Sequence, residues 1–167
     1  MNQTLSFLYS DKDELSFSLK KSIFNLNQLN IPALGSLEDL NHLENLFKSS
    51  SFIALIKINN NLVGFAIIIN SLSEYSSPNY LYFKKIYNDF MYIDRIAISE
   101  KYNRKGFGSL IYNELSNQSK NLGIPLCCEV NTKPINQQSL DFHKKLEFSI
   151  IEEITFGKKT VAMMVNN

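Results

Sequence analysis

The chain has 167 residues, 17 of them basic and 16 acidic, which gives a formal net charge of +1. That length fits one domain spanning 1–167, and 44% hydrophobic residues argue against general disorder. The charge balance disfavours nucleic acid and anionic membranes as partners, and two adjacent cysteines, Cys127 and Cys128, suit neither a disulfide framework nor a metal site.

The sequence predicts neither a targeting signal nor a membrane-spanning segment. The N-terminal segment lacks a basic region followed by a long apolar run, so a signal peptide is not expected. The longest apolar run, over 62–69, has eight residues, whereas a helix that spans a membrane needs about 20. We therefore expect a cytoplasmic protein with no membrane partner and no metal.

Apolar spacing in the first half of the chain predicts both helices and strands. Ser10 or Asp11 would cap a helix whose apolar residues recur at helical spacing until Pro32 ends it. Consecutive asparagines at 59–61 suit a hairpin turn, because asparagine tolerates positive φ. The expected elements are a strand at 5–9, helices at 11–29 and from 36 onward, and strands at 52–58 and 62–69.

The second half predicts a mixed sheet. A polar and aromatic connection over 71–90, with a short helix after Pro78, leads into alternating strands and helices. Because hairpin and crossover connections both occur, the sheet should contain antiparallel and parallel pairs. The expected elements are a strand at 91–98, a helix at 106–122, a strand at 125–130, a helix at 136–146, and strands at 150–156 and 160–165.

Two of the six glycines, Gly106 and Gly108, lie between an expected strand and an expected helix, beside Lys101, Arg104 and Lys105. The first turn of a helix offers unpaired N–H groups, and glycine lets a ligand approach the backbone. The segment therefore predicts a phosphate-binding turn, although it matches neither the P-loop nor the dinucleotide pattern. The alternative is an ordinary helix start with solvated lysines.

At these glycines the sequence resembles the GNAT superfamily of N-acetyltransferases, whose acetyl-CoA loop reads Gln/Arg-x-x-Gly-x-Gly/Ala. Asn103 takes the place of Gln/Arg. A second family signature runs from Asn-x-x-Ala/Ser to Gly-Phe; here Glu147 replaces the glycine, and His143 stands where tyrosine is commonest. The residues that match it are Asn136, Ser139, Phe142, Leu146 and Phe148. Other stretches resemble a poorly characterised bacterial branch of acetyltransferases.

The resemblance implies an α/β (α+β) fold of the GNAT type. Its central mixed, mostly antiparallel sheet would have about six or seven strands, splayed between the fourth and fifth, with about four flanking helices. It also implies an enzyme that moves an acetyl group from acetyl-CoA to a primary amine of a small molecule or peptide. The alternative is a non-catalytic module that binds acyl-CoA, for instance as a sensor. Relatives often pair through their C-terminal strands, which makes a homodimer a further expectation.

The resemblance also assigns the residues that hold acetyl-CoA. The pantetheine arm would pair with the backbone of Ile96, Ala97 and Ile98, and an N–H near Ile98 would polarise the thioester carbonyl. The diphosphate maps to the turn formed by Arg104, Lys105, Gly106, Phe107, Gly108 and Ser109. The second signature would supply Asn136, Ser139, Phe142 and His143 to the cofactor.

Transfer to an amine requires a base for the amine proton and an acid for the leaving thiolate. Asp94 and Glu129 are candidates for the base, and Glu129 lies where ribosomal-protein N-terminal acetyltransferases carry a glutamate. Alternatively, Asp94 forms a structural pair with Arg95 or caps a loop, and Glu129 is a satisfied buried carboxylate. His143 is the candidate acid, because imidazole titrates near neutral pH; the alternative is a structural histidine.

Five of the eight tyrosines fall between positions 75 and 92, more rings than a surface loop normally carries. We expect Tyr80, Tyr82 and Tyr92 to form an aromatic wall over the acceptor amine. The alternative is a small satellite core that covers one face of the sheet.

Overall fold

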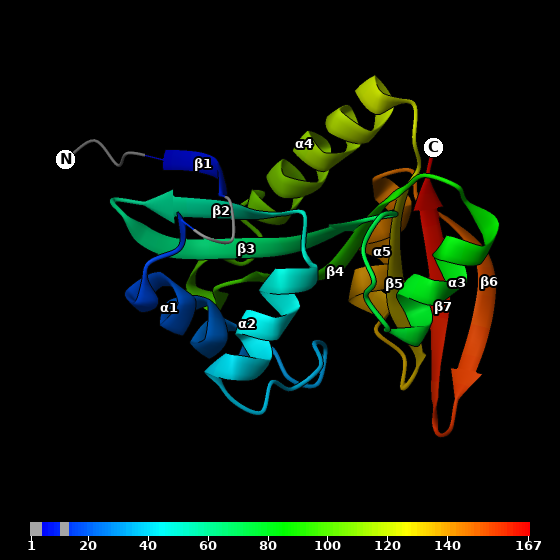
Figure 1. The fold of residues 1–167 in the computed structure, drawn as a ribbon, viewed down its shortest axis with the longest axis horizontal. Helices are drawn as coiled ribbons and strands as arrows, with labels where there is room; N and C mark the ends of the chain where they lie inside the picture. The colour runs from blue at the N-terminus through cyan, green and yellow to red at the C-terminus, as the bar shows by residue number, and fades with distance from the viewer. Residues whose placement is uncertain (1–4, 11–13) are drawn as a thin grey trace. The chain divides into compact units, whose positions relative to one another are not determined.

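The structure, a computed structural model, describes residues 5–10 and 14–167. In that part of the chain, strands and helices follow one another in the order shown in Figure 1. The elements are β1 (Leu5–Ser10), α1 (Phe17–Gln28), α2 (Leu40–Ser49), β2 (Phe52–Ile58), β3 (Asn61–Asn70), α3 (Pro78–Ile86), β4 (Met91–Ile98), the 3₁₀ helix η2 (Glu100–Tyr102), α4 (Phe107–Leu122), β5 (Leu126–Lys133), α5 (Gln137–Lys145), β6 (Ser149–Phe156) and β7 (Lys159–Asn166).

The described chain forms two compact units, and the backbone passes between them at the end of β3, inside β4 and inside α4. The first unit contains the described residues up to Ile69 together with Asp94–Ile111. The second contains Asn70–Ile93 and Tyr112–Asn167. Neither unit is a continuous stretch of sequence. The expectation of a single domain over 1–167 stays a prediction.

The strands form a mixed, mostly antiparallel sheet in the order β1-β2-β3-β4-β5-β7-β6. β2 runs antiparallel to β1 and β3, and β7 runs antiparallel to β5 and β6. β4 and β5 are parallel, and their register comprises only Met91 with Leu126 and Tyr92 with Cys127. A pairing that ends after two residues is what a splay between these strands requires. The predicted α+β class with a mixed, mostly antiparallel sheet is confirmed, with a fifth α-helix because the segment after Pro78 forms the full helix α3.

The first unit is built around β2 and β3, whose central residues are almost all buried. Ile53, Phe65 and Ile67 are among its fully buried side chains. Figure 1 shows α1 and α2 together on one side of this hairpin, and their buried residues include Ile23 and Leu43. The turn between the strands has positive φ at Asn59 and Asn60, as the three asparagines predicted.

The first helix begins later than the sequence predicted. β1 continues through Ser10, so this residue pairs in the sheet rather than capping a helix, and the alternative cap, Asp11, lies outside the described residues. Ser16 is the actual cap, since its hydroxyl accepts a hydrogen bond from Leu19 N. α2 was predicted to start from residue 36 onward and begins at Leu40. Asp39 caps it, because its carboxylate accepts a hydrogen bond from His42 N.

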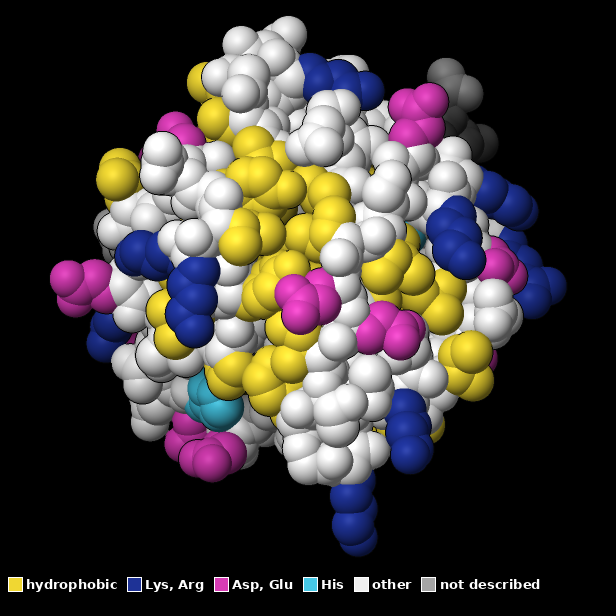
Figure 2. Space-filling model, turned by 90° about the vertical axis from the view of Figure 1, so that its right-hand side faces the viewer, with side chains coloured by type: hydrophobic (Ala, Val, Ile, Leu, Met, Phe, Trp, Pro, Cys, Tyr) yellow, Lys and Arg dark blue, Asp and Glu magenta, His cyan; other side chains and the backbone are white. Residues whose placement is uncertain are grey.

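The second unit combines buried strands with an exposed edge. β7 is buried over most of its length, and both cysteines of β5 are buried as expected. β6 is the last strand of the sheet and is exposed along most of its length. The side of the molecule shown in Figure 2 presents hydrophobic side chains at its centre, with lysine and arginine towards its margins. Nowhere in the described chain is a helix long and apolar enough to cross a bilayer.

Candidate functional site

The turn before α4 is held in a conformation that presents backbone N–H groups. Arg104 has φ of 60° and Gly106 has φ of 85°, so left-handed residues alternate through the turn. Leu110 N donates to Gly106 O at 2.9 Å, which makes Gly106 the residue before the first helical turn. The amides of 107–109 therefore precede the intrahelical bonding pattern. Such a concave run of N–H groups at the positive end of a 16-residue helix suits an anion.

Two lysines beside this turn lie against one aromatic ring. The ammonium nitrogens of Lys101 and Lys105 are 5.4 Å and 5.2 Å from the centroid of the Tyr102 ring. The Tyr102 ring in turn meets the Phe107 ring edge to face, with centroids 5.9 Å apart. Among the residues that the structure describes, neither lysine nor Arg104 forms an ion pair with a carboxylate. The basic charge of the turn is thus uncompensated.

The end of β4 lies against a glycine of β3. A Cβ atom added to Gly64 would collide with Ile98 Cδ1 and would lie 3.0 Å from Ala97 O. Ser99 N also donates to Val63 O at 2.8 Å, which fixes the end of β4 against β3. Gly64 therefore makes room for the Ile98 side chain and for the backbone to which the resemblance assigns the pantetheine arm.

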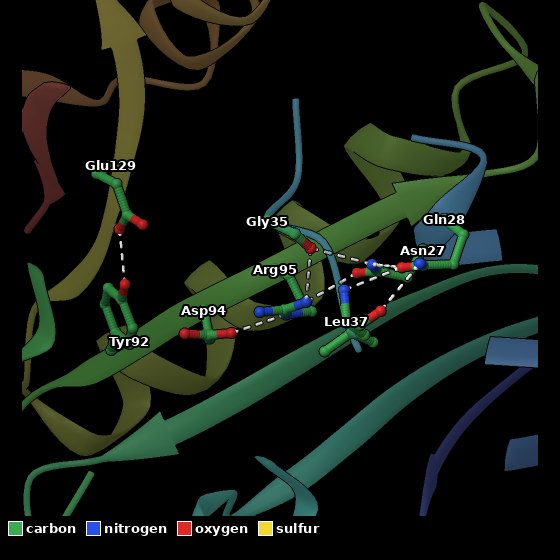
Figure 3. A network of polar contacts seen from close by, with 8 residues as sticks. All are labelled: Asn27, Gln28, Gly35, Leu37, Tyr92, Asp94, Arg95 and Glu129. Carbon is green, nitrogen blue, oxygen red and sulfur yellow. Dashed lines mark hydrogen bonds and ion pairs between the residues drawn. The ribbon is translucent and has the colours of Figure 1, made fainter. Parts of the chain in front are cut away.

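Asp94 belongs to an ion pair that anchors the loop between α1 and α2 (Figure 3). Arg95 Nε lies 2.9 Å from Asp94 Oδ2, and the two side chains are only 11% and 5% exposed. The same guanidinium donates through Nη1 to Asn27 Oδ1 at 2.8 Å and to Gly35 O at 3.3 Å. The sequence left this pairing open as an alternative to catalysis, and the structure forms it.

The same loop is bonded to the end of α1 by amide side chains. Asn27, which is fully buried, donates to Gly35 O at 3.1 Å. Gln28 both donates to Leu37 O and accepts from Leu37 N, each at 3.0 Å. Asp94 therefore takes part in a structural network that reaches α1.

Glu129 has a different kind of partner, also drawn in Figure 3. Tyr92 donates its phenolic hydrogen to Glu129 Oε2 at 2.8 Å. Tyr92 is fully buried, and its ring packs against those of Tyr80 and Phe83 with centroids 5.7 Å and 5.9 Å away. Glu129 itself is only partly buried. A rigid neutral phenol thus orients a carboxylate that keeps some solvent exposure.

His143 lies inside an aromatic cage, and both of its ring nitrogens contact polar atoms. Nδ1 lies 2.7 Å from Ser139 O, which can only accept, so Nδ1 carries the hydrogen. Burial lowers the pKa of His143, which favours the neutral ring, although its contact with Ser139 acts in the opposite direction. Nε2 then accepts from Tyr112 OH at 2.6 Å. The rings of Tyr112, Phe142 and Phe148 surround it edge to face.

The second signature shapes the ends of α5. Asn136 caps the helix by accepting from Ser139 N at 3.1 Å. Glu147, which stands where the family has glycine, has φ of 66°, the left-handed conformation that glycine adopts without strain. In the described structure these residues have structural roles; contact of Asn136, Ser139, Phe142 or His143 with a cofactor stays a prediction.

The expected aromatic wall is largely interior. Tyr80 and Tyr92 are fully buried together with Phe83 and Phe90. These rings form the small satellite core that was expected as the alternative to an aromatic wall. Tyr82 is partly exposed; burial and a hydrogen bond with Glu152 raise its pKa to about 12. Contact of any of these tyrosines with an acceptor stays a prediction.

Three residues of the candidate site were not predicted from the sequence. Tyr112 lies in the long helix at ordinary helical spacing, and Gly64 lies within an apolar strand, so neither showed a local signal. Tyr102 could have been found, because it stands between the two lysines in the basic segment. No three His, Cys, Asp or Glu side chains lie together as metal ligands would within the described ranges.

The sequence matches the family model described as the acetyltransferase (GNAT) family over residues 21–148. A search of curated proteins found no match. Among solved structures, the chain resembles an N-acetyltransferase from Staphylococcus aureus, with 17% identity, a TM-score of 0.71 and coverage of 98% of both chains.

Two further similar structures have more specific names. The ribosomal-protein-S18-alanine N-acetyltransferase from Escherichia coli shares 14% identity, with a TM-score of 0.67 and coverage of 96% of this chain and 92% of that one. The IAA acetyltransferase from Bacillus cereus shares 15% identity, with a TM-score of 0.62 and coverage of 97% and 98%. At these identities the likeness shows a shared fold.

Proposed function

The chain belongs to the GNAT acetyltransferase family, and on that premise we propose that it transfers the acetyl group of acetyl-CoA to a primary amine of a small molecule or peptide. The observation that carries this proposal is the turn before α4. Its left-handed residues, Arg104 and Gly106, present the N–H groups of the first helical turn, and its basic side chains are unopposed by carboxylates of the described residues. That combination suits the diphosphate of coenzyme A.

The remaining donor contacts would come from the backbone at the end of β4. Pairing of β4 with β5 stops after Tyr92, so the β4 backbone beyond it has no β5 register partner. The pantetheine arm would take up that bonding capacity along Ile96–Ile98. An N–H near Ile98 would then polarise the thioester carbonyl as negative charge develops on its oxygen.

The amine nitrogen would attack the acetyl carbonyl, its proton would pass to a base, and the carbon–sulfur bond would break with thiolate as the leaving group. We assign the base to Glu129 rather than Asp94. Asp94 already neutralises Arg95, whereas Glu129 accepts a hydrogen bond from the neutral Tyr92 and stays partly exposed. A carboxylate of the second kind is better able to take up a proton directly or through a water.

Binding is tested by thermal unfolding with and without about 1 mM acetyl-CoA, since a ligand of the folded state raises the melting temperature. Gly106→Glu should abolish the shift, because it places a carboxylate where the phosphate would lie. Gly123→Glu is the matched control: Gly123 also has positive φ, at 68°, and open space around its α-carbon, but lies after α4. Absence of a shift in the unsubstituted protein, or its survival in Gly106→Glu, would contradict the proposal.

Turnover is tested by thiol release from acetyl-CoA with a panel of primary amines. The panel should include small amines and a peptide that begins with alanine, since one similar structure is named for an alanine N-acetyltransferase. Release that depends on an added amine, together with the acetylated product by mass spectrometry, supports the transferase. Acetyl-CoA binding without release across the panel would favour the non-catalytic acyl-CoA-binding module instead.

A further inference from the structure

We propose that Lys101 and Lys105, held on the ring of Tyr102, form a subsite for the 3′-phosphate of coenzyme A, so that the protein selects donors that carry this phosphomonoester. This inference rests on the proposed function, because it concerns the same donor. It identifies which kind of pantetheine thioester the turn accepts. A dephosphorylated coenzyme A thioester would fit the diphosphate site but would leave this subsite empty.

The basic side chains of the turn carry more positive charge than the diphosphate needs. The diphosphate of coenzyme A can be met by the backbone amides of 107–109, which precede the hydrogen-bonding pattern of α4. The three cationic side chains of the turn therefore exceed what the diphosphate requires. Coenzyme A carries one more anionic group, a phosphomonoester with a charge of about −1.5 to −2 at neutral pH. That group matches two ammonium groups better than one.

The ammonium groups of Lys101 and Lys105 are gathered at one aromatic ring. Lysine side chains on a surface are normally mobile, and fixing them costs conformational entropy. Here the nitrogens of Lys101 and Lys105 both lie within 5.4 Å of the centroid of one ring. The cation–π attraction gathers both charges beside the turn before any anion arrives. Such preorganisation reduces the cost of binding a doubly charged group.

The Tyr102 ring is held in place by its backbone and by a neighbouring ring. Tyr102 closes the 3₁₀ helix Glu100–Tyr102, in which its N–H donates to Ser99 O at 2.8 Å. Its ring also packs edge to face on Phe107, the first residue of α4. The ring that gathers the lysines is thus tied to the same helix start that would hold the diphosphate. The two phosphate sites would therefore lie next to each other, as they do on one nucleotide.

The test measures dissociation constants of acetyl-CoA and of acetyl-dephospho-CoA by calorimetry. We expect the protein to bind acetyl-CoA about 10- to 100-fold more tightly, the range for charge-assisted hydrogen bonds to one anionic group. In the double variant Lys101→Ala/Lys105→Ala the preference should fall below about threefold, because the affinity for acetyl-CoA falls more than the affinity for acetyl-dephospho-CoA does. Lys48→Ala removes one lysine charge from α2 and should leave the preference unchanged.

Two Tyr102 variants separate the ring from the lysines. Tyr102→Phe keeps an aromatic face and should retain the preference, whereas Tyr102→Leu should lose most of it although both lysines remain. Thermal unfolding shows whether each variant is folded. Equal binding of the two thioesters by the unsubstituted protein, or a full preference in the double lysine variant, would overturn the inference and leave the proposed function standing. Failure of acetyl-CoA to bind at all would overturn both.

Discussion

Asp94 lies on β4 and Glu129 lies on β5, the next strand in the sheet. The two carboxylates have different types of hydrogen-bond partner. Asp94 is 5% exposed and pairs with a guanidinium that also holds Asn27 and the loop after α1. Glu129 is partly buried and accepts a hydrogen bond from a phenol whose ring is packed in an aromatic core. One carboxylate is bound into a structural network, and the other is oriented by a neutral donor.

The difference shows that strand position alone does not determine the role of an acidic residue. A carboxylate paired with arginine keeps its charge and its place, which serves stability. A carboxylate that accepts a hydrogen bond from a neutral hydroxyl keeps a defined orientation, which serves proton transfer. The following experiments test this division, from the largest expected effect to the smallest.

Glu129→Gln should lower kcat by about 10²-fold or more, because the amide cannot accept the amine proton. Asp94→Asn should lower kcat far less if the division of roles is correct. Steady-state rates at saturating acetyl-CoA, measured with the amine that proves active, compare the two variants. Equal rate losses in both, or an unchanged rate in Glu129→Gln, would remove the distinction.

Asp94→Asn should instead lower the free energy of unfolding by about 1–3 kcal/mol, because it leaves the nearly buried Arg95 without its counter-charge. Urea denaturation measures this change. Asp141→Asn on α5 is a suitable control, since Asp141 is exposed and accepts a hydrogen bond from Gln137 Nε2 on its own helix. If Asp94→Asn were as stable as this control, the network would not be structural.

Tyr92→Phe should keep the aromatic packing but remove the hydrogen bond to Glu129. We expect kcat to fall about 10-fold and the acid limb of the pH–rate profile to move to higher pH, because the ionised carboxylate loses a donor. Tyr80→Phe is the matched control: its hydroxyl donates to Asn70 O and Ser73 O rather than to a carboxylate. A shifted acid limb in the control as well would show that packing, not the Tyr92 hydrogen bond, matters.

His143 extends the comparison to a buried titratable group whose ring nitrogens contact the neutral groups Tyr112 OH and Ser139 O. Burial lowers the pKa of His143 below its ordinary value of 6.5. The unfolded chain therefore binds a proton at a higher pH than the folded chain does. The associated stability is fully present above about pH 6.5 and is lost as the pH falls towards the folded pKa, by about 1.4 kcal/mol for each unit of difference.

The urea midpoint of unfolding should therefore decrease more between about pH 7.5 and about pH 5.5 in the unsubstituted protein than in His143→Phe. Phenylalanine occupies the aromatic cage without titrating. His42→Phe serves as the control, because His42 is exposed on α2. The same pH dependence in the protein and in His143→Phe would show that this histidine does not contribute to acid sensitivity.

Most elements could be predicted because their signals are local. The strand at 91–98 was predicted with the bounds of β4, and the asparagine turn has the expected positive φ. The predicted start of α1 was wrong because Ser10, Asp11 and Ser16 are all suitable N-caps by residue type. Ser10 pairs with β2 as part of β1, so it cannot cap the helix, and Ser16 does so. Local propensity cannot weigh a contact with a strand more than 40 residues away.

The sequence by itself determined the basic turn, since its glycines, its lysines and the helix that follows are neighbours along the chain. Only the tertiary structure decided what the candidate acid and bases contact. The hydrogen bonds of Arg95 with Asn27, of Tyr92 with Glu129 and of Tyr112 with His143 span 68, 37 and 31 residues. Many donors of the same type could serve equally well in an extended chain, and packing of the core selects the one that comes within reach.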